Sequence, residues 1–390
     1  MLKMAIIGQA ARGEAYLARP QITARVKDNL DKEGNVLLVA PRRVGKSSLL
    51  FDLLDNPPAN SLVIYYTSES VNSENEYYKK LFNHLVERLK GVKKHATKVT
   101  AIAKDLFSRI EEINIKGSVK IGESKVSYFN ELQKLLDTIE LREEKIIILN
   151  DELASTVENI IRDENPSSAI HFLGTMRELR QSPTLNKKVR FIFAGSIGLG
   201  NIVSKLEVVN LVNDLTEVTI PPLSQNEASK LVGKIINGSS LTISPGGFQH
   251  LLNVIEWWIP YYFQILLDES YTILQERNET VISETVIDEA VKKALKHRLY
   301  FEHWFTRLRK AFEGDDFSFV KDVLNLASEK QTVSSAEIVN FATQHKLEDS
   351  YKHLLNALKY DGYLNNDADA KIYRFNSPLL REWWRCNVAN

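Results

Sequence analysis

The sequence predicts an α/β fold built on a parallel β-sheet, and three of its features lead to that prediction. First, a short apolar run at 36–39 breaks into a tight turn and restarts as a helical pattern that continues to residue 50. Second, the apolar run at 146–149 is continuous, as expected of a parallel strand buried on both faces, and another strand pattern follows at 188–194. Third, helical patterns lie between these runs, which is how crossover helices join parallel strands.

The turn after the first strand has the pattern of a phosphate-binding loop. Residues 40–48 match GxxxxGK[ST], except that Ala40 stands where the first glycine is usual. Gly45 permits a backbone conformation that strains other residues, so successive N–H groups can converge on one anion. We expect Lys46 to bring a charge to the phosphates and Ser47 to ligate Mg²⁺, with the positive end of the next helix directed at the same anion.

A chance turn between a strand and a helix is the alternative interpretation of this loop. The strand before it and the helix after it are both present, which favours a nucleotide site. The loop residues predicted to bind the nucleotide are Ala40, Pro41, Arg42, Arg43, Val44, Gly45, Lys46, Ser47 and Ser48.

The composition is that of an ordinary globular protein. The 390 residues are 44% hydrophobic and 26% charged, which leaves room for two or three domains. Fifty basic residues balance fifty acidic ones, so no overall field draws the chain to nucleic acid or to an anionic membrane. The single cysteine, Cys386, excludes an internal disulfide and a cysteine metal site. The most apolar stretch, 257–267, is too short to span a bilayer, and we expect a cytoplasmic protein with no membrane partner.

Helices and strands alternate between the loop and the next chemical site. A helical run at 21–31 precedes the loop strand, and a β-rich run at 61–67 predicts the second strand. Helical patterns then extend over 76–107. Apolar residues that alternate with polar ones around two glycines predict a hairpin near 113–127, inserted before the next core strand.

The second chemical site lies at the end of the run 145–152, where Asp151 and Glu152 follow four apolar residues. In phosphate-loop enzymes, Mg²⁺ and the attacking water sit at this end of the sheet. We therefore expect Asp151 to hold the metal and Glu152 to orient and deprotonate the water. Many strands exit into acidic turns, so the run alone is a weak signal. Its place after the loop and one intervening strand makes it stronger.

Three more residues are candidates for the chemistry. Arg177 and Arg180 lie one turn apart near the end of the helix predicted at 167–181. They can cap carboxylates or helix carbonyls, or one of them can act in trans as an arginine finger on another molecule. Ser196 follows the strand at 188–194, where a small polar side chain can hydrogen-bond the γ-phosphate or the attacking water. An ordinary turn serine is the alternative for Ser196.

Five segments of the chain, taken in order, carry a family resemblance. They are Ala40–Leu50, Ile148–Leu153, Ala194–Leu199, Asn213–Leu215 and Pro221–Ser224. Together they resemble the archaeal-type ATPases, in the STAND branch of the AAA+-like phosphate-loop ATPases, over nearly the whole chain. The resemblance implies ATP and Mg²⁺ as cofactors and a five-stranded parallel sheet in the order 5-1-4-3-2. It also implies three domains: an ATPase domain at 1–222, a helical lid at 223–300 and a winged helix at 301–390.

The chain departs from the family at three places. Tyr16-Leu-Ala-Arg-Pro20 replaces the family's Phe-Phe-Asp-Arg-Glu lead-in, Asn150 replaces an apolar residue, and Trp258 replaces the glycine of a Gly-x-Pro turn. Pro260, at a helix start in that turn, can pack near the base of the nucleotide, although its aromatic neighbours favour a plain core role. No lid arginine stands out as a second sensor of the γ-phosphate.

The carboxyl-terminal part predicts a winged helix, in which three helices precede a β-hairpin. The three helical patterns and two short apolar runs lie at 317–327, 334–345, 349–360, 363–364 and 372–375. The third helix enters the groove in DNA-binding versions, yet from Lys346 to Gly362 three lysines meet three acidic residues. This balance favours a protein-facing role. Ser377 and Pro378 predict the start of a last, amphipathic helix.

These residues predict an ATP-dependent molecular switch that hydrolyses ATP slowly and reports its nucleotide state to a protein effector or to a homo-oligomer. The alternative is a DNA-binding regulator or loader that uses ATP to dock its winged helix; DNA is the less favoured partner. The family resemblance also implies prokaryotic conflict systems, including phage defence, as the setting.

Overall fold

A computed structural model describes residues 6–91, 126–139, 145–195 and 198–389. These residues form two compact units. The first, called here the sheet unit, comprises Ala18–Val39 and Leu49–Thr219. The second, the helical unit, comprises Met1–Leu17, Ala40–Ser48 and Ile220–Asn390. Most of the hairpin predicted near 113–127, and Ser196, lie outside the described residues.

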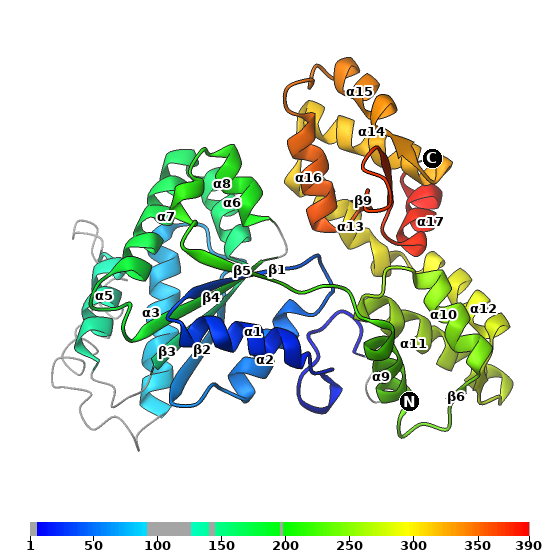
Figure 1. The fold of residues 1–390 in the computed structure, drawn as a ribbon, viewed down its shortest axis with the longest axis horizontal. Coiled ribbons are helices and arrows are strands. Elements are labelled where there is room, and N and C mark those ends of the chain that lie inside the picture. Colours follow the sequence, from blue (N-terminus) through cyan, green and yellow to red (C-terminus); the bar gives the residue numbers. More distant parts are fainter. Residues whose placement is uncertain (1–5, 92–125, 140–144, 196–197, 390) are drawn as a thin grey trace, which may run out of the picture. The chain divides into compact units, whose positions relative to one another are not determined.

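The sheet unit contains a parallel sheet of five strands (Figure 1). In chain order they are β1 (Asn35–Val39), β2 (Ser61–Thr67), β3 (Lys145–Asp151), β4 (Val189–Gly195) and β5 (Leu215–Thr219). Across the sheet the order is β2-β3-β4-β1-β5, and every pairing is parallel. This is the order 5-1-4-3-2 that the family resemblance implies, so the expected strand order is confirmed.

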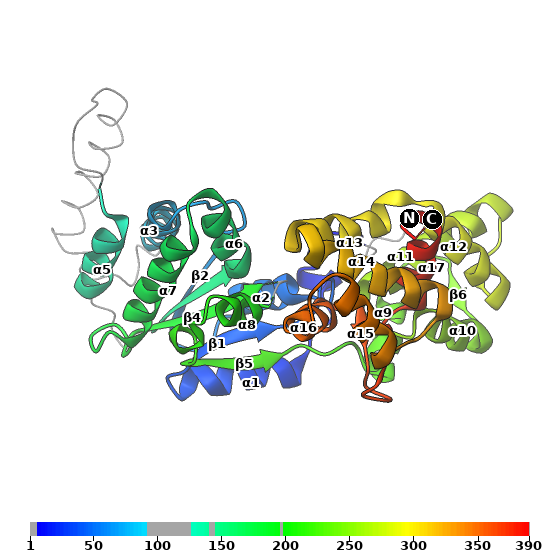
Figure 2. The same cartoon turned by 90° about the horizontal axis from the view of Figure 1, so that it is seen from above.

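Successive side chains of each strand point to opposite faces of the sheet, and helices cover both faces. Ile146 and Ile148 of β3 join the core that α3, α5, α6 and α7 build on one face. On the other face, α1 packs against β1 and β5 through Val26 and Leu30. Figure 2 shows α1 on the opposite side of the sheet from α3, α6 and α7. The helices are α1 (Pro20–Asp31), α2 (Lys46–Asp55), α3 (Glu74–Gly91), α5 (Tyr128–Thr138), α6 (Leu153–Asp163), α7 (Pro166–Gln181), α8 (Leu199–Lys205) and the 3₁₀ helix η2 (Val209–Leu211).

The first part of the helical unit is a group of helices with one short parallel strand pair. A capping box starts α9, because Ser224 accepts from the Glu227 amide while the Glu227 carboxylate accepts from the Ser224 amide. Pro260 is the first residue of α11, as predicted. The elements are η1 (Gly13–Ala15), α9 (Gln225–Ile236), β6 (Thr242–Ile243), α10 (Pro245–Ile255), α11 (Pro260–Arg277), β7 (Val281–Ile282) and α12 (Glu284–Lys296).

The remainder of the helical unit forms a winged helix, as the sequence predicts. It begins after helix α13 and contains three helices and an antiparallel sheet in the order β8-β10-β9. Helix α13 itself spans residue 300, where the domain boundary is expected. The elements are α13 (Arg298–Ala311), α14 (Gly314–Lys330), β8 (Val333–Ser334), α15 (Ser335–Gln344), α16 (Tyr351–Asp361), β9 (Leu364–Asn365), β10 (Ile372–Phe375) and α17 (Pro378–Asn387).

The last helix, α17, closes the core of the winged helix. Ser377 caps it by accepting a hydrogen bond from the Leu380 amide. Trp384 is fully buried, donates from Nε1 to Asn325 Oδ1 of α14 at 2.9 Å, and lies 6.2 Å from Phe375 of the wing between ring centroids. The helix start predicted at Ser377 and Pro378 is confirmed, and the tail packs against the wing. No helix in the described part of the chain is both long enough and apolar enough to cross a lipid bilayer.

Candidate active site

The carboxyl ends of β1, β4 and β3 lie at one edge of the sheet, because the three strands are parallel neighbours. The phosphate-type loop leaves this edge directly after Val39, and Asp151 is the last residue of β3. Ligands of open α/β sheets bind outside the carboxyl ends of their strands. The topology therefore brings both predicted chemical segments to the edge where such a ligand would bind.

The predicted phosphate loop has an unusual backbone at two residues. Arg43 and Gly45 both have positive φ, at 66° and 110°, and no atom lies within 4 Å of the place that a Cβ on Gly45 would take. The conformation predicted for Gly45 is therefore confirmed. Helix α2 starts at Lys46, so its amino end faces the loop. The Lys46 ammonium donates to the carbonyl oxygens of Ala40 and Pro41 at 2.8 and 3.1 Å.

Arg43 of the loop contacts two other segments of the helical unit. Its Nη1 donates to the Gly8 carbonyl at 2.9 Å, and its guanidinium lies 4.7 Å from the centre of the Tyr261 ring of α11. His303 of α13 packs edge-on against the same tyrosine. Burial, and then the charges of Arg43 and Arg42, lower the pKa of His303 to about 3, so its imidazole is neutral at physiological pH.

The end of α16 also touches the loop. Gly362, at φ 89°, lies so close that a Cβ added there would stand 3.0 Å from Pro41 Cβ and 2.4 Å from the Trp257 ring. The neighbouring Asp361 is buried and pairs with Arg307 at 3.7 Å. Burial raises the pKa of the Asp361 carboxyl, while Arg307, Arg42 and Lys46 act in the opposite direction. The winged helix thus brings a carboxyl group into the electrostatic surroundings of the loop lysine.

Asp151 is buried at the end of β3, and Tyr65 of β2 holds its side chain. The Tyr65 hydroxyl donates to Asp151 Oδ2 at 3.4 Å, and its ring packs on Phe51 of α2 at 4.8 Å between centroids. Burial, and then the negative charge of Asp151, raise the pKa of Tyr65 well above its ordinary value. Tyr65 therefore stays protonated and serves as a hydrogen-bond donor to the carboxylate.

Glu152 occupies an unusual backbone position. With φ 65° and ψ 36° it is in the left-handed region, which a residue with a side chain adopts at some cost, and it is the N-cap of α6. Ser155 donates from its hydroxyl to Glu152 Oε2 at 3.2 Å. The extended backbone of β3 therefore ends at Asp151, and the chain turns at Glu152 into α6.

Sequence reasoning missed several side chains that support this strand end. Tyr65 holds the Asp151 carboxylate, and Ser68 and Asn150 bond the Asp151 carbonyl oxygen. Their position was visible in part: Ser68 follows the second predicted strand directly, and Asn150 breaks an otherwise apolar run. The hydrogen bonds from Tyr65 and Ser68 to Asp151, and from Asn150 to Ser68, join residues at least 82 positions apart in the chain, which no local pattern indicates.

The two finger candidates lie in different surroundings. Arg180 is buried and forms a bidentate ion pair with Asp214, in which Nε donates to Oδ2 at 2.7 Å and Nη2 donates to Oδ1 at 2.9 Å. Its Nη2 also donates to the Leu211 carbonyl. Arg180 therefore takes the first of the two roles expected for it, because its buried guanidinium bonds a carboxylate and a carbonyl of its own chain. Arg177 is partly exposed and donates to the Asn210 carbonyl.

We expect Arg180→Ala to lower the free energy of unfolding by about 3 kcal/mol, because it leaves the Asp214 carboxylate without its partner. Urea denaturation measures the change. The control is Arg162→Ala, which removes an exposed pair with Asp163 in the same unit and should leave the unfolding midpoint unchanged. Equal midpoints for the two variants would contradict a structural role for Arg180.

Comparisons with known proteins agree with the architecture. No protein-family model matches the sequence, and no curated protein does. The Walker-type ATPase PABY2304 of Pyrococcus abyssi is 15% identical, with a TM-score of 0.68, and the match covers 98% of this chain and 99% of that one. The ORC2 protein of Aeropyrum pernix, solved as ADPNP–ADP complexes, is 10% identical, with a TM-score of 0.59 and coverage of 97% and 94%. At such identities the likeness establishes the fold, and the chain has the α/β P-loop NTPase fold.

Proposed function

We propose that the protein binds Mg-ATP at residues 40–48 and hydrolyses it to ADP and phosphate. The observation that carries this proposal is the shared sheet edge, from which the loop leaves β1 and at which β3 ends in Asp151. Phosphate release from ATP by the purified chain, with Mg²⁺ and with Mg²⁺ chelated, tests it. Release that requires Mg²⁺ supports the proposal, and no release above a protein-free blank overturns it.

The residues present fit this chemistry. Mg²⁺ prefers oxygen ligands, and the Ser47 hydroxyl and the buried Asp151 carboxylate are donors of that kind. When bound, the ion would neutralise charge that develops on the β- and γ-phosphate oxygens. In our proposal Lys46 gives up its bonds to the loop carbonyls and bonds phosphate oxygens. Glu152 then takes a proton from the attacking water, whose oxygen bonds the γ-phosphorus as ADP leaves.

We further propose that the loop is where nucleotide state is passed to the rest of the helical unit. Support comes from its contacts with three segments of that unit: Gly8 in the lead-in, Tyr261 in α11 and Gly362 at the end of α16. A loop that rearranges around phosphates would disturb each contact. The lid and the winged helix are therefore the parts that would report the nucleotide to a partner.

Gly362→Ala should push the winged helix off the loop, since its Cβ would meet both Pro41 and Trp257. Moving the Asp361 carboxyl away from Lys46 removes a competing negative charge, which we expect to tighten ATP binding by about 1 kcal/mol, roughly fivefold in Kd. Fluorescent-nucleotide titration measures it. The control is Gly238→Ala, which has a similar φ of 76° but open space around its Cβ position. Unchanged or weaker binding in Gly362→Ala would contradict the coupling.

We propose a homo-oligomer or a protein effector as the partner that completes the site. Arg177 is the remaining candidate for a finger in trans, and Ser196, outside the described residues, stays a predicted sensor. Specific ATPase activity across a concentration series, for the parent and for Arg177→Ala, tests this role. The family resemblance supports membership of the STAND branch and a setting in prokaryotic conflict or phage-defence systems as further parts of the proposal.

A second candidate function is ATP-dependent DNA binding through α16. The observation in its favour is an exposed face of this helix that carries Lys352, His353 and Asn356. Against it, the turn of the wing exposes Asp367 and Asp369, which would repel the DNA backbone. Anisotropy titration with duplex DNA at two salt concentrations separates the candidates, because phosphate contacts produce a steep salt dependence.

A further inference from the structure

The carbonyl oxygen of Asp151 is held by three hydrogen bonds. The Ser68 amide donates to it at 2.9 Å, the Ser68 hydroxyl at 3.2 Å and the Asn150 side-chain amide at 3.3 Å. Asn150 Nδ2 also donates to the Ser68 hydroxyl oxygen at 2.8 Å, which locks the two side chains together. This carbonyl belongs to the peptide group that joins Asp151 to Glu152, so the bonds fix the plane of that peptide.

The plane of this peptide decides where the Glu152 carboxylate points. Glu152 has φ 65°, a left-handed conformation that costs on the order of 1–3 kcal/mol and persists only where neighbouring structure holds it. If the Asp151 carbonyl were released, Glu152 could relax toward the ordinary right-handed region. Thr156 supports the arrangement from α6, since its hydroxyl donates to the Ser68 carbonyl at 2.8 Å.

The clamp is anchored from outside the strand. The Tyr77 hydroxyl, on α3, donates to Asn150 Oδ1 at 3.2 Å, and this selects the amide orientation in which Nδ2 faces Ser68 and Asp151. The side chains of Ser68, Tyr77, Asn150 and Thr156 are all completely buried. Buried polar groups joined in this way are rigid, because any one that loses its partner pays its full desolvation cost.

We propose that Asn150 and Ser68 are positioning residues for hydrolysis: held by Tyr77 of α3, they clamp the Asp151–Glu152 peptide and keep the Glu152 carboxylate aimed at the attacking water. This inference rests on the proposed role of Glu152 as the base. It assigns Tyr77, far from the phosphate loop in sequence, an effect on turnover and not on nucleotide affinity. It also implies that a movement of α3 would shift Tyr77 and, through Asn150, the end of β3 that carries Asp151 and Glu152.

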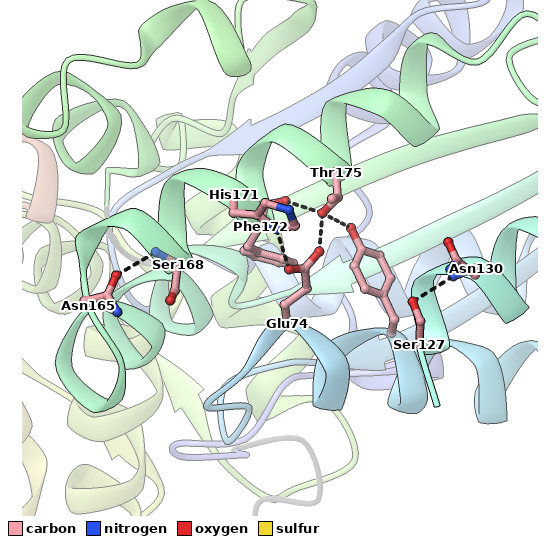
Figure 3. Close-up of polar contacts among 9 residues, drawn as sticks. Glu74, Ser127, Asn130, Asn165, Ser168, His171, Phe172 and Thr175 are labelled. Carbon is pink, nitrogen blue, oxygen red and sulfur yellow. Dashed lines mark hydrogen bonds and ion pairs between the residues drawn. The ribbon is translucent and has the colours of Figure 1, made fainter. Parts of the chain in front are cut away.

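Two adjacent tyrosines provide the test. Tyr77→Phe removes the bond to Asn150, and Tyr78→Phe removes an equally buried hydroxyl on the same helix that bonds Thr175 at 2.8 Å instead. Thr175 in turn donates to the Glu74 carboxylate, which also bonds His171, so this network does not include Asn150 or Ser68 (Figure 3). We expect kcat to fall about tenfold in Tyr77→Phe with an unchanged KM for ATP, because misplacing a catalytic group affects the transition state and not substrate binding. Tyr78→Phe should keep the kcat of the parent.

A second variant and a second measurement complete the test. Asn150→Leu removes the clamp amide with little change in volume and should lower kcat further, by about 10- to 100-fold. Amide hydrogen exchange at Ser68, whose N–H bonds the Asp151 carbonyl, should speed up in Tyr77→Phe and Asn150→Leu and not in Tyr78→Phe.

The outcomes separate the two proposals. A parent that hydrolyses no ATP overturns the proposed function, and the exchange measurement still decides whether the clamp exists. An active parent with equal kcat in Tyr77→Phe and Tyr78→Phe overturns the positioning role, as does an effect confined to KM. Unchanged Ser68 exchange in all three variants overturns the clamp itself.

Discussion

Lys46→Ala is expected to weaken ATP binding by about 3 kcal/mol, roughly 100-fold or more in Kd, because a charged donor to two phosphate oxygens is lost. Folding should survive, since the bonds that Lys46 makes in the structure go to two carbonyls of its own loop, Ala40 and Pro41. Calorimetric titration with ATP measures the affinity, and urea denaturation checks the fold.

A matched control for Lys46→Ala is Lys188→Ala. Lys188 also donates to two backbone carbonyls, those of Asp137 and Ile139, at 3.0 and 3.3 Å, but it precedes β4 at the amino end of the strands. It should leave ATP affinity unchanged. If Lys46→Ala binds ATP as well as Lys188→Ala, residues 40–48 are not the phosphate site.

Glu152→Gln should retain ATP binding and lose turnover by about 10²–10⁴-fold, the range that a positioned general base contributes. The substitution keeps the size of the side chain and the bond from Ser155, so the left-handed turn at Glu152 is preserved. Single-turnover hydrolysis measures the chemical step without interference from product release.

Asp151→Asn distinguishes the proposed role of Asp151 from that of Glu152. It should weaken the Mg²⁺-dependent part of ATP binding, since a neutral amide is a poorer ligand for a hard cation than a carboxylate. Full hydrolysis by Glu152→Gln would reject that residue as the base while leaving the metal role of Asp151 open to its own test. The pair of variants thus distinguishes binding from chemistry at one strand end.

The sequence by itself determined the local features of this protein. The glycine of the loop, the serine caps of α9 and α17 and the proline at the start of α11 act within a few residues of themselves. Continuous apolar runs likewise marked the buried strands. The order of the strands came from the family resemblance and not from these patterns, because strand order depends on crossovers that local periodicity does not record.

Only the tertiary structure decided which polar groups meet. Arg180 pairs with Asp214, 34 residues further on, and this burial removes it from the exposed surface on which a finger in trans would stand. Tyr77 bonds Asn150, 73 residues further along the chain. The left-handed conformation of Glu152 likewise depends on hydrogen bonds to the Asp151 carbonyl that come from outside the strand. The reason is physical. A helix cap or a loop glycine is specified by neighbours along the chain, whereas a buried hydrogen bond is specified by the packing of whole elements against one another.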